Sequence, residues 1–232
     1  MDRTTQTSDH FLTVFFFQCG RIGLLDTWPF EVTPLHPQFG CEIKGVTLEE
    51  AVSDTVFPII YEAFLRYQLI LFRVVDLPPA TLVALARRFG EVQVHVMNQY
   101  HGYADQPEIY VLSNRDEHGR PNGKHPDNGT LFWHTDGSWR PTPGLATMMY
   151  SERVPEAGGH TEFASTYEAY DRLSREMKAR LGGLNAIHNL DFSRTRRHGE
   201  EPITEEQKRK VPPVPHPVIR RHPETDRPAL FL

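Results

Sequence analysis

The sequence predicts one α+β domain whose short strands form a β-sandwich or barrel. Hydrophobic residues make up 39% of the 232 residues and charged residues 24%, which suits a single packed core and argues against wholesale disorder. Apolar residues recur with period two in some segments and with helical spacing in others. In the second half of the chain, short strand-like runs alternate with turn signals, as in all-β layers.

Four strands are expected in the first hundred residues. FEVTPL (30–35) and CEIKGV (41–46) alternate apolar and polar residues, which predicts a short antiparallel pair. LILFRV (69–74) is continuously apolar before its arginine and is expected as a buried strand. EVQVHV (91–96) returns to period-two alternation and predicts a further strand.

Two helices are expected between these strands. Apolar residues at helical spacing run from residue 53 to Tyr67, with Ser53 as a candidate N-cap. The second helix, TLVALARRF, opens at Pro78 and Pro79 and is closed by Gly90. The first ninety residues are therefore expected to be mixed α and β.

The rest of the chain predicts mainly strands. One helical stretch, from Tyr167 to Leu181, is ended by Gly182 and Gly183. The polar segment 115–129 is predicted to be a long loop, and the charged, proline-rich segment 193–215 a mobile excursion. The expected strands are EIYVLSN (108–114), LFWHTD (131–136), LATMMYSE (145–152), HTEFAS (160–165), LNAIHNLDF (184–192) and a final strand-turn-strand over 216–232.

We expect residues 1–28 to be a poorly ordered N-terminal extension and residues 29–232 to form the domain. FLTVFFF (11–17) lacks a basic start and a small-residue cleavage site, which favours a frayed extension or an incorrect start codon over a signal peptide. No run approaches the roughly 20 apolar residues of a membrane span, so no membrane partner is expected.

Composition also narrows the compartment and the partners. Only Cys19 and Cys41 are present, too few for a disulfide framework or a cysteine zinc site, which suits a reducing cytoplasm. The net charge of -5, with Lys and Arg scattered among acidic residues, argues against a nucleic-acid partner.

The segment Trp133-His134-Thr135-Asp136 carries the sharpest chemical signal. On a strand, His134 and Asp136 are two residues apart and project from the same face. One imidazole and one carboxylate are two thirds of the facial triad that holds non-haem Fe(II). Because H-x-D also occurs by chance, a surface pair without a metal is the alternative that this motif alone leaves open.

Several motifs in order resemble the taurine dioxygenase and 2,4-dichlorophenoxyacetate dioxygenase (TauD/TfdA) family, which uses Fe(II) and 2-oxoglutarate. The resemblance spans about residues 30–232. It implies a double-stranded β-helix (jelly roll) with flanking helices. The segments that carry it are WHTDGSW, P-x-P-G, YSERVPEAGGHTEFASTYEAYDRL, FEVTPLHPQFGCEIKGVTL, LILFRV, RRFGE and HPVIRRHPETDRPAL.

The resemblance also implies roles for five residues. His134 and Asp136 match the first two iron ligands, and Thr161 matches a threonine that contacts the 2-oxoglutarate carboxylate. His95 matches a substrate-pocket histidine, and Asn128 is a candidate pocket asparagine. The alternatives are a packing role for Thr161 and a solvent-facing strand position for His95.

The family's distal histidine ligand and its 2-oxoglutarate-binding arginine fall beyond the ALFL segment, so we expect a C-terminally incomplete domain that lacks its last strands. Two ligands alone would bind iron weakly. The candidate replacements for the third ligand are His188, His198, His216 and His222.

The expected function is therefore an Fe(II)- and 2-oxoglutarate-dependent oxygenase that uses O2 to hydroxylate a small anionic organic acid, releasing succinate and CO2. Taurine-like sulfonates and aryloxyalkanoates are the two substrate classes, and the loop over 113–129 resembles the aryloxyalkanoate branch more closely. The alternative is an inactive truncated homologue, or a fragment completed by another chain. A cupin-like binding module is a third hypothesis, and the resemblance also allows a homo-oligomer.

Overall fold

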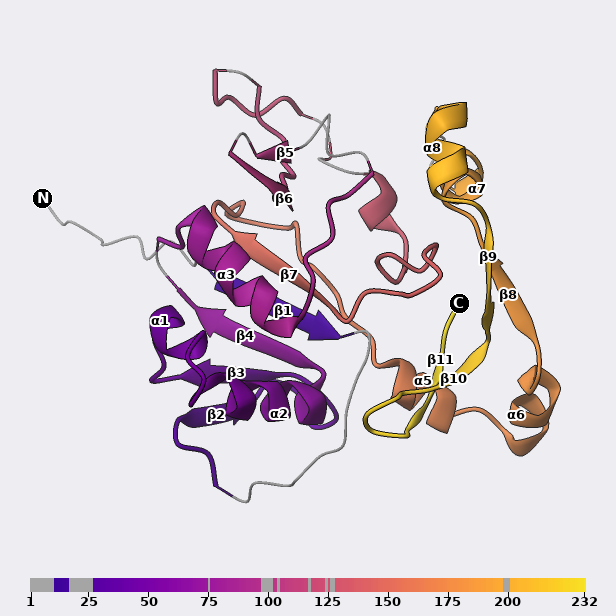
Figure 1. The fold of residues 1–232 in the computed structure, drawn as a ribbon, viewed down its shortest axis with the longest axis horizontal. Helices are drawn as coiled ribbons and strands as arrows, with labels where there is room; N and C mark the ends of the chain where they lie inside the picture. The colour runs from indigo at the N-terminus through magenta and orange to yellow at the C-terminus, as the bar shows by residue number, and fades with distance from the viewer. Residues whose placement is uncertain are drawn as a thin grey trace, which may run out of the picture. The chain divides into compact units, whose positions relative to one another are not determined.

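In the computed structural model the chain forms two compact units, and Figure 1 labels their helices and strands. Unit 1 comprises Met1–Glu91, Leu145–Leu173 and Arg221–Ala229, and unit 2 comprises Val92–Gly144, Ser174–Arg220 and Leu230–Leu232. The structure describes residues 11–16, 27–74, 76–96, 102–103, 105–116, 118–123, 125, 128–197 and 201–232.

Unit 1 is built on a five-stranded sheet in the order β2-β3-β4-β1-β7. Its strands are β1 (Phe11–Phe16), β2 (Glu31–Pro34), β3 (Cys41–Lys44), β4 (Leu69–Arg73) and β7 (Ala146–Ser151). The predicted antiparallel pairing of β2 with β3 is confirmed. The pair β3 and β4 is parallel, and β1 runs antiparallel to both of its neighbours.

The expectation of a poorly ordered extension over residues 1–28 is wrong for Phe11–Phe16. This segment is β1, which lies between β4 and β7 in the middle of the sheet. Leu12 and Val14 are both 0% exposed, because their side chains enter the core while both strand edges are hydrogen-bonded. A strand buried on both faces reads as a continuous apolar run, so the alternation used to recognise the other strands was absent here.

Helices α1 (Leu48–Ala51), α2 (Phe57–Tyr67) and α3 (Pro79–Phe89) pack together, and α2 also packs on β1 and β4. The two predicted helices correspond to α2 and α3. Ser53 is not the N-cap of α2: its hydroxyl accepts from Val56 N in the turn before the helix, at 3.2 Å. Gly90 ends α3 with φ of 146°, as expected for a glycine terminator.

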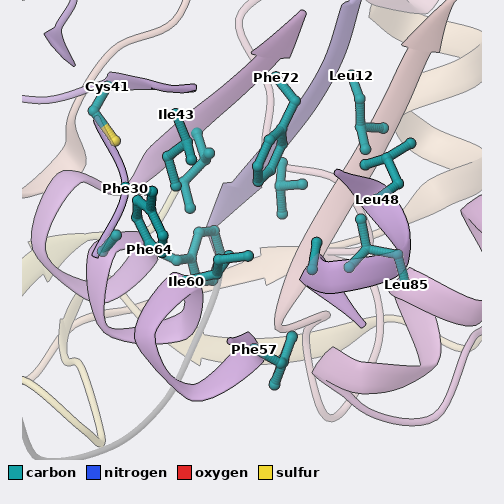
Figure 2. Close-up of a cluster of buried hydrophobic side chains, with 14 of the residues drawn as sticks. Leu12, Phe30, Cys41, Ile43, Leu48, Phe57, Ile60, Phe64, Phe72 and Leu85 are labelled. Atoms are coloured by element: carbon teal, nitrogen blue, oxygen red, sulfur yellow. The ribbon is translucent and has the colours of Figure 1, made fainter. Parts of the chain in front are cut away.

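The buried core of unit 1 joins the sheet to these helices (Figure 2). Phe64 and Phe72 are almost fully buried, one on α2 and the other on β4. Cys41 on β3 belongs to the same cluster, where burial raises the pKa of its thiol to about 12 and disfavours the reactive thiolate. One cluster of buried side chains therefore packs the sheet, including β1, against the helices.

The predicted helix over 167–181 is present as two helices, α5 (Thr166–Asp171) in unit 1 and α6 (Arg175–Leu181) in unit 2. They separate because Ser174 caps α6, its hydroxyl accepting from Met177 N at 3.1 Å.

Unit 2 is less regular. It contains β5 (Gly102–Tyr103) paired with β6 (Gln106–Tyr110), and β8 (Asn185–His188) paired antiparallel with β9 (Val214–Pro217). Its remaining elements are the 3-10 turn η1 (Asn128–Leu131), α7 (Leu190–Phe192), the π-turn η2 (Ser193–Arg197) and α8 (Glu205–Lys210). The predicted C-terminal hairpin is confirmed as β10 (Ile219–Arg221) and β11 (Pro228–Leu230).

Three predicted strands are absent from the described structure: 91–96, 131–136 and 160–165 form no strand. Their alternating apolar residues are not buried against a core, as Val94 and Trp133 show, with exposed fractions of 47% and 65%. Period-two alternation predicts a strand only where a neighbouring strand is available for pairing. The described strands form one five-stranded and three two-stranded sheets.

Within the described ranges, no helix is both long and apolar enough to cross a lipid bilayer.

The position of β1 predicts that Leu12→Ala strongly destabilises the fold. Truncating a fully buried leucine removes apolar contacts and leaves a cavity, so we expect a loss of about 2–5 kcal/mol in the free energy of unfolding. Urea unfolding followed by circular dichroism measures it. The matched control is Leu184→Ala, at a leucine that is 49% exposed, and we expect little change there. A loss at Leu12 as small as at Leu184 would contradict the central placement of β1.

Candidate functional site

The side chains of His134 and Asp136 converge, as predicted. His134 Nε2 lies 3.2 Å from Asp136 Oδ1, and both side chains are just over two fifths exposed. His134 Nδ1 lies 2.7 Å from the carbonyl oxygen of Phe132. Because that oxygen only accepts, Nδ1 carries the proton of this hydrogen bond, and the Nε2 side of the ring faces the carboxylate.

The backbone produces this convergence through a turn, not through the predicted strand. The chain leaves η1 and bends immediately after Asp136. Gly137 has φ of 64°, a conformation that glycine adopts without steric cost. Two further turn bonds follow, Ser138 N to Thr135 O at 3.4 Å and Arg140 N to Gly137 O at 3.0 Å. The pair is thus presented at the start of a compact double turn.

His95 lies in a small aromatic group of unit 2. The centroid of its ring lies 4.8 Å from the ring centroid of Tyr110 on β6 and 6.1 Å from that of Trp139. Both pairs are close to edge-on. Trp139 is three residues after Asp136, so the turn that carries the Asp136 carboxylate also carries an aromatic ring that packs beside His95. The alternative of a solvent-facing strand histidine is wrong, because His95 is half-buried and residues 91–96 form no strand.

Arg140 is a residue that sequence reasoning missed. Its Nη1 donates to Gln93 Oε1 at 2.6 Å, its Nη2 to Val94 O at 3.5 Å, and its guanidinium lies 4.7 Å from the Trp139 ring centroid. Burial lowers the pKa of Arg140 from its ordinary value, but the group remains a cation at neutral pH. The only sequence signal was its place four residues after Asp136, which by itself names no partner.

The two remaining predicted site residues are Asn128 and Thr161. Asn128 begins η1, six residues before His134, and its side chain is outside the described part of the structure. Thr161 belongs to unit 1, where its side chain is exposed and follows the turn at Gly158 and Gly159. That turn requires glycine: Gly159 has φ of 68°, and a Cβ there would lie 2.9 Å from Pro155 Cγ.

The candidate replacement ligands have other contacts. His216 and His188 are buried in unit 2, with ring centroids 5.2 Å apart, and both pack on Phe231. His216 Nε2 lies 2.9 Å from the carbonyl oxygen of Arg140. His198 lies outside the described residues.

His222 belongs to unit 1 and shapes the C-terminal hairpin. Its Nδ1 accepts from the backbone N–H of Glu224 and of Thr225, at 3.3 and 3.2 Å, and its ring contacts Tyr167 edge-on. Among the described residues, no three His, Cys, Asp or Glu side chains gather in an arrangement that could hold a metal ion. The idea that His188, His216 or His222 completes a triad therefore has no support in the described structure.

The arrangement of His134 and Asp136 fits two neighbouring ligands of one metal ion. An octahedral ion with bonds of about 2.1 Å holds adjacent ligand atoms about 3 Å apart, close to the observed 3.2 Å. A ligating histidine usually donates its other ring N–H to a carbonyl or carboxylate, which fixes the tautomer and the ring orientation. The bond to Phe132 O has this form.

Comparison with protein families gives one match that spans most of the chain. The model described as "Taurine catabolism dioxygenase TauD, TfdA family" matches residues 31–232, which include every described residue of the candidate site.

Curated relatives and solved structures agree with this match. The (S)-phenoxypropionate/alpha-ketoglutarate-dioxygenase of Sphingobium herbicidovorans is 29% identical over 219 residues, covering 88% of this chain and 70% of that protein. The alpha-ketoglutarate-dependent 2,4-dichlorophenoxyacetate dioxygenase of Cupriavidus pinatubonensis is 29% identical over 206 residues, covering 86% of this chain and 71% of that protein. The crystal structure of AAD-2 with Mn(II) and N-oxalylglycine superposes with a TM-score of 0.63 at 25% identity, over 88% of this chain and 69% of that one.

Proposed function

Because the chain belongs to the taurine catabolism dioxygenase TauD, TfdA family, we propose that it is an Fe(II)- and 2-oxoglutarate-dependent oxygenase of small organic acids. The observation that carries the proposal is the convergence of His134 Nε2 and Asp136 Oδ1 at 3.2 Å, inside the matched segment. When bound, iron supplies activation of O2 coupled to conversion of 2-oxoglutarate to succinate and CO2. The protein contributes binding, orientation and control of water access.

In this proposal His134 and Asp136 provide two ligands to the iron. The hydrogen bond to Phe132 O keeps the proton on Nδ1, so the Nε2 lone pair is directed to the metal. The carboxylate supplies the negative charge that balances part of the cation's charge. The turn at Gly137 holds both groups on one short segment, which limits how far they can separate.

Thr161 is proposed to bind 2-oxoglutarate. Its hydroxyl can donate one hydrogen bond to a carboxylate oxygen, and hydrogen bonds to charged acceptors are stronger than neutral ones. The exposure of Thr161 and the two positive-φ glycines just before it suit a backbone turn that presents a side chain for binding. We also propose that the sheets of the chain are parts of a double-stranded β-helix, the architecture expected for this family.

An aryloxyalkanoate is the substrate class that we favour. Two of the relatives carry phenoxypropionate and 2,4-dichlorophenoxyacetate in their names. His95 is proposed to face the anionic head group, and the neighbouring rings of Tyr110 and Trp139 offer the apolar surface that an aryl ring needs. Asn128 is proposed as a further pocket residue. A taurine-like sulfonate is the alternative substrate.

The function predicts substrate-dependent formation of succinate. The protein with Fe(II), 2-oxoglutarate and O2 is incubated with phenoxyacetate, 2-phenoxypropionate or taurine, and succinate and product are quantified. We expect turnover with a phenoxyalkanoate and a loss of at least about 100-fold in His134→Ala or Asp136→Ala, since each change removes a ligand. His118→Ala, at an exposed histidine outside the pair, is the control. Turnover that survives both ligand substitutions would exclude this metal site.

Thr161 gives a second prediction. Thr161→Val keeps the shape of the side chain but removes the hydroxyl, so we expect the KM for 2-oxoglutarate to rise about tenfold, as for the loss of one charge-assisted hydrogen bond. Thr161→Ser retains the hydroxyl and should stay within about threefold of the original protein. Steady-state succinate assays at varied 2-oxoglutarate measure both. Equal KM values for the valine and serine variants would assign Thr161 to packing instead.

A further inference from the structure

We propose that Arg140 is a positioning residue that sets the location of His95 relative to the His134 and Asp136 pair. The inference rests on the proposed function, in which His95 contacts the organic substrate and the pair holds the metal. It adds a determinant of substrate binding that is separate from the proposed metal ligands and from the proposed 2-oxoglutarate contact at Thr161.

The segment that carries His95 needs such a residue. Residues 91–96 form no strand, so no ladder of backbone hydrogen bonds to a neighbouring strand fixes their path. The guanidinium of Arg140 contacts two of them, by hydrogen bonds to Gln93 Oε1 at 2.6 Å and to Val94 O at 3.5 Å. The Val94 acceptor is the backbone carbonyl immediately before His95, and the Gln93 acceptor is a side-chain oxygen one residue earlier, so Arg140 contacts the segment once at its backbone and once at a side chain.

Trp139 adds the second contact between the same two segments. Its indole lies edge-on to the ring of His95, with 6.1 Å between the two ring centroids, and the Arg140 guanidinium lies 4.7 Å from the indole centroid. Arginine is suited to this double task, because its planar fork donates in two directions while its face stacks on an aromatic ring. The Trp139 side chain therefore contacts the His95 ring, and the Arg140 side chain contacts the backbone of the preceding residue, Val94.

The backbone of Arg140 is held independently of its side chain. Its N–H donates to Gly137 O at 3.0 Å within the turn after Asp136, and its carbonyl oxygen lies 2.9 Å from His216 Nε2. His216 is itself buried against His188 and Phe231. Arg140 is thus anchored to the interior of unit 2 at one end and to the His95 segment at the other.

This arrangement separates two properties of the site. The hydrogen bonds around the metal pair, from His134 Nδ1 to Phe132 O and within the Gly137 turn, are not made by the guanidinium. The location of His95 depends on the guanidinium. Loss of the Arg140 side chain should therefore impair binding of the organic substrate while leaving metal and 2-oxoglutarate binding nearly unchanged.

The test compares Arg140→Ala, Arg140→Lys and Gln93→Ala with the original protein. We expect the KM for the phenoxyalkanoate to rise about tenfold in Arg140→Ala and to recover only partly in Arg140→Lys, which cannot bond two acceptors in one plane and stack at once. Affinity for Mn(II) alone, measured by electron paramagnetic resonance, and the KM for 2-oxoglutarate should stay within about twofold. Arg120→Ala, at an exposed arginine of the same unit, is the matched control.

A double-mutant cycle with His95→Ala identifies the route of the effect. If Arg140 acts through His95, then Arg140→Ala adds little to the KM of a protein that already lacks the imidazole. Additive effects of the two substitutions would overturn the inference, and so would a KM for the phenoxyalkanoate that Arg140→Ala leaves unchanged. Gln93→Ala removes the side-chain acceptor of Arg140 Nη1. An unchanged KM for the phenoxyalkanoate in Gln93→Ala would count against the contact between Arg140 and Gln93, even if the Arg140 variants do not fold.

One readout is independent of turnover. The readout is the NMR chemical shift of the His95 ring nitrogens in the metal-free protein. These signals are assigned by their loss in His95→Ala. They should shift in Arg140→Ala and not in Arg120→Ala. If the original protein converts none of the acids, the proposed function fails, and these signals still decide whether Arg140 positions His95. Unshifted His95 signals in Arg140→Ala would overturn the inference.

Discussion

The pairing of β1 between β4 and β7 is the constraint on which unit 1 depends. Without this strand, β7 would lose its only neighbour in the described sheet, and the edge of β4 would be open to water. The side chain of Leu12 on β1 shows this constraint, because it is fully buried. The chain leaves β7 at Ser151 and reaches the glycine turn that precedes Thr161, the proposed cosubstrate contact, seven residues later at Gly158.

In unit 2 a single hydrogen bond constrains the orientation of the His134 ring. The carbonyl of Phe132 accepts from His134 Nδ1 and so selects which ring nitrogen faces Asp136. A freely rotating imidazole would lose entropy on binding a metal, and this hydrogen bond already restricts the ring in the way that the proposed ligand role of His134 requires.

Side chains, more than strand ladders, hold the segments around the candidate site. The H-x-D segment and the His95 segment belong to no strand, and Arg140, Trp139 and His216 provide contacts that join or support them. Such contacts restrain a loop at a few points while leaving the backbone free to carry different residues.

The sequence by itself determined the family, the candidate metal pair and the regular elements whose residues are half-buried, such as β2, β3, α2 and α3. These features depend on local pattern: alternation, helical spacing, glycine terminators and the short H-x-D motif. Only the tertiary structure decided that Phe11–Phe16 is a central strand, that 91–96 and 131–136 are not strands, and that Arg140 links two segments. The reason is physical, because a strand exists only where a partner edge is available, and a long cationic side chain finds its acceptors by the path of the folded chain and not by its neighbours in sequence.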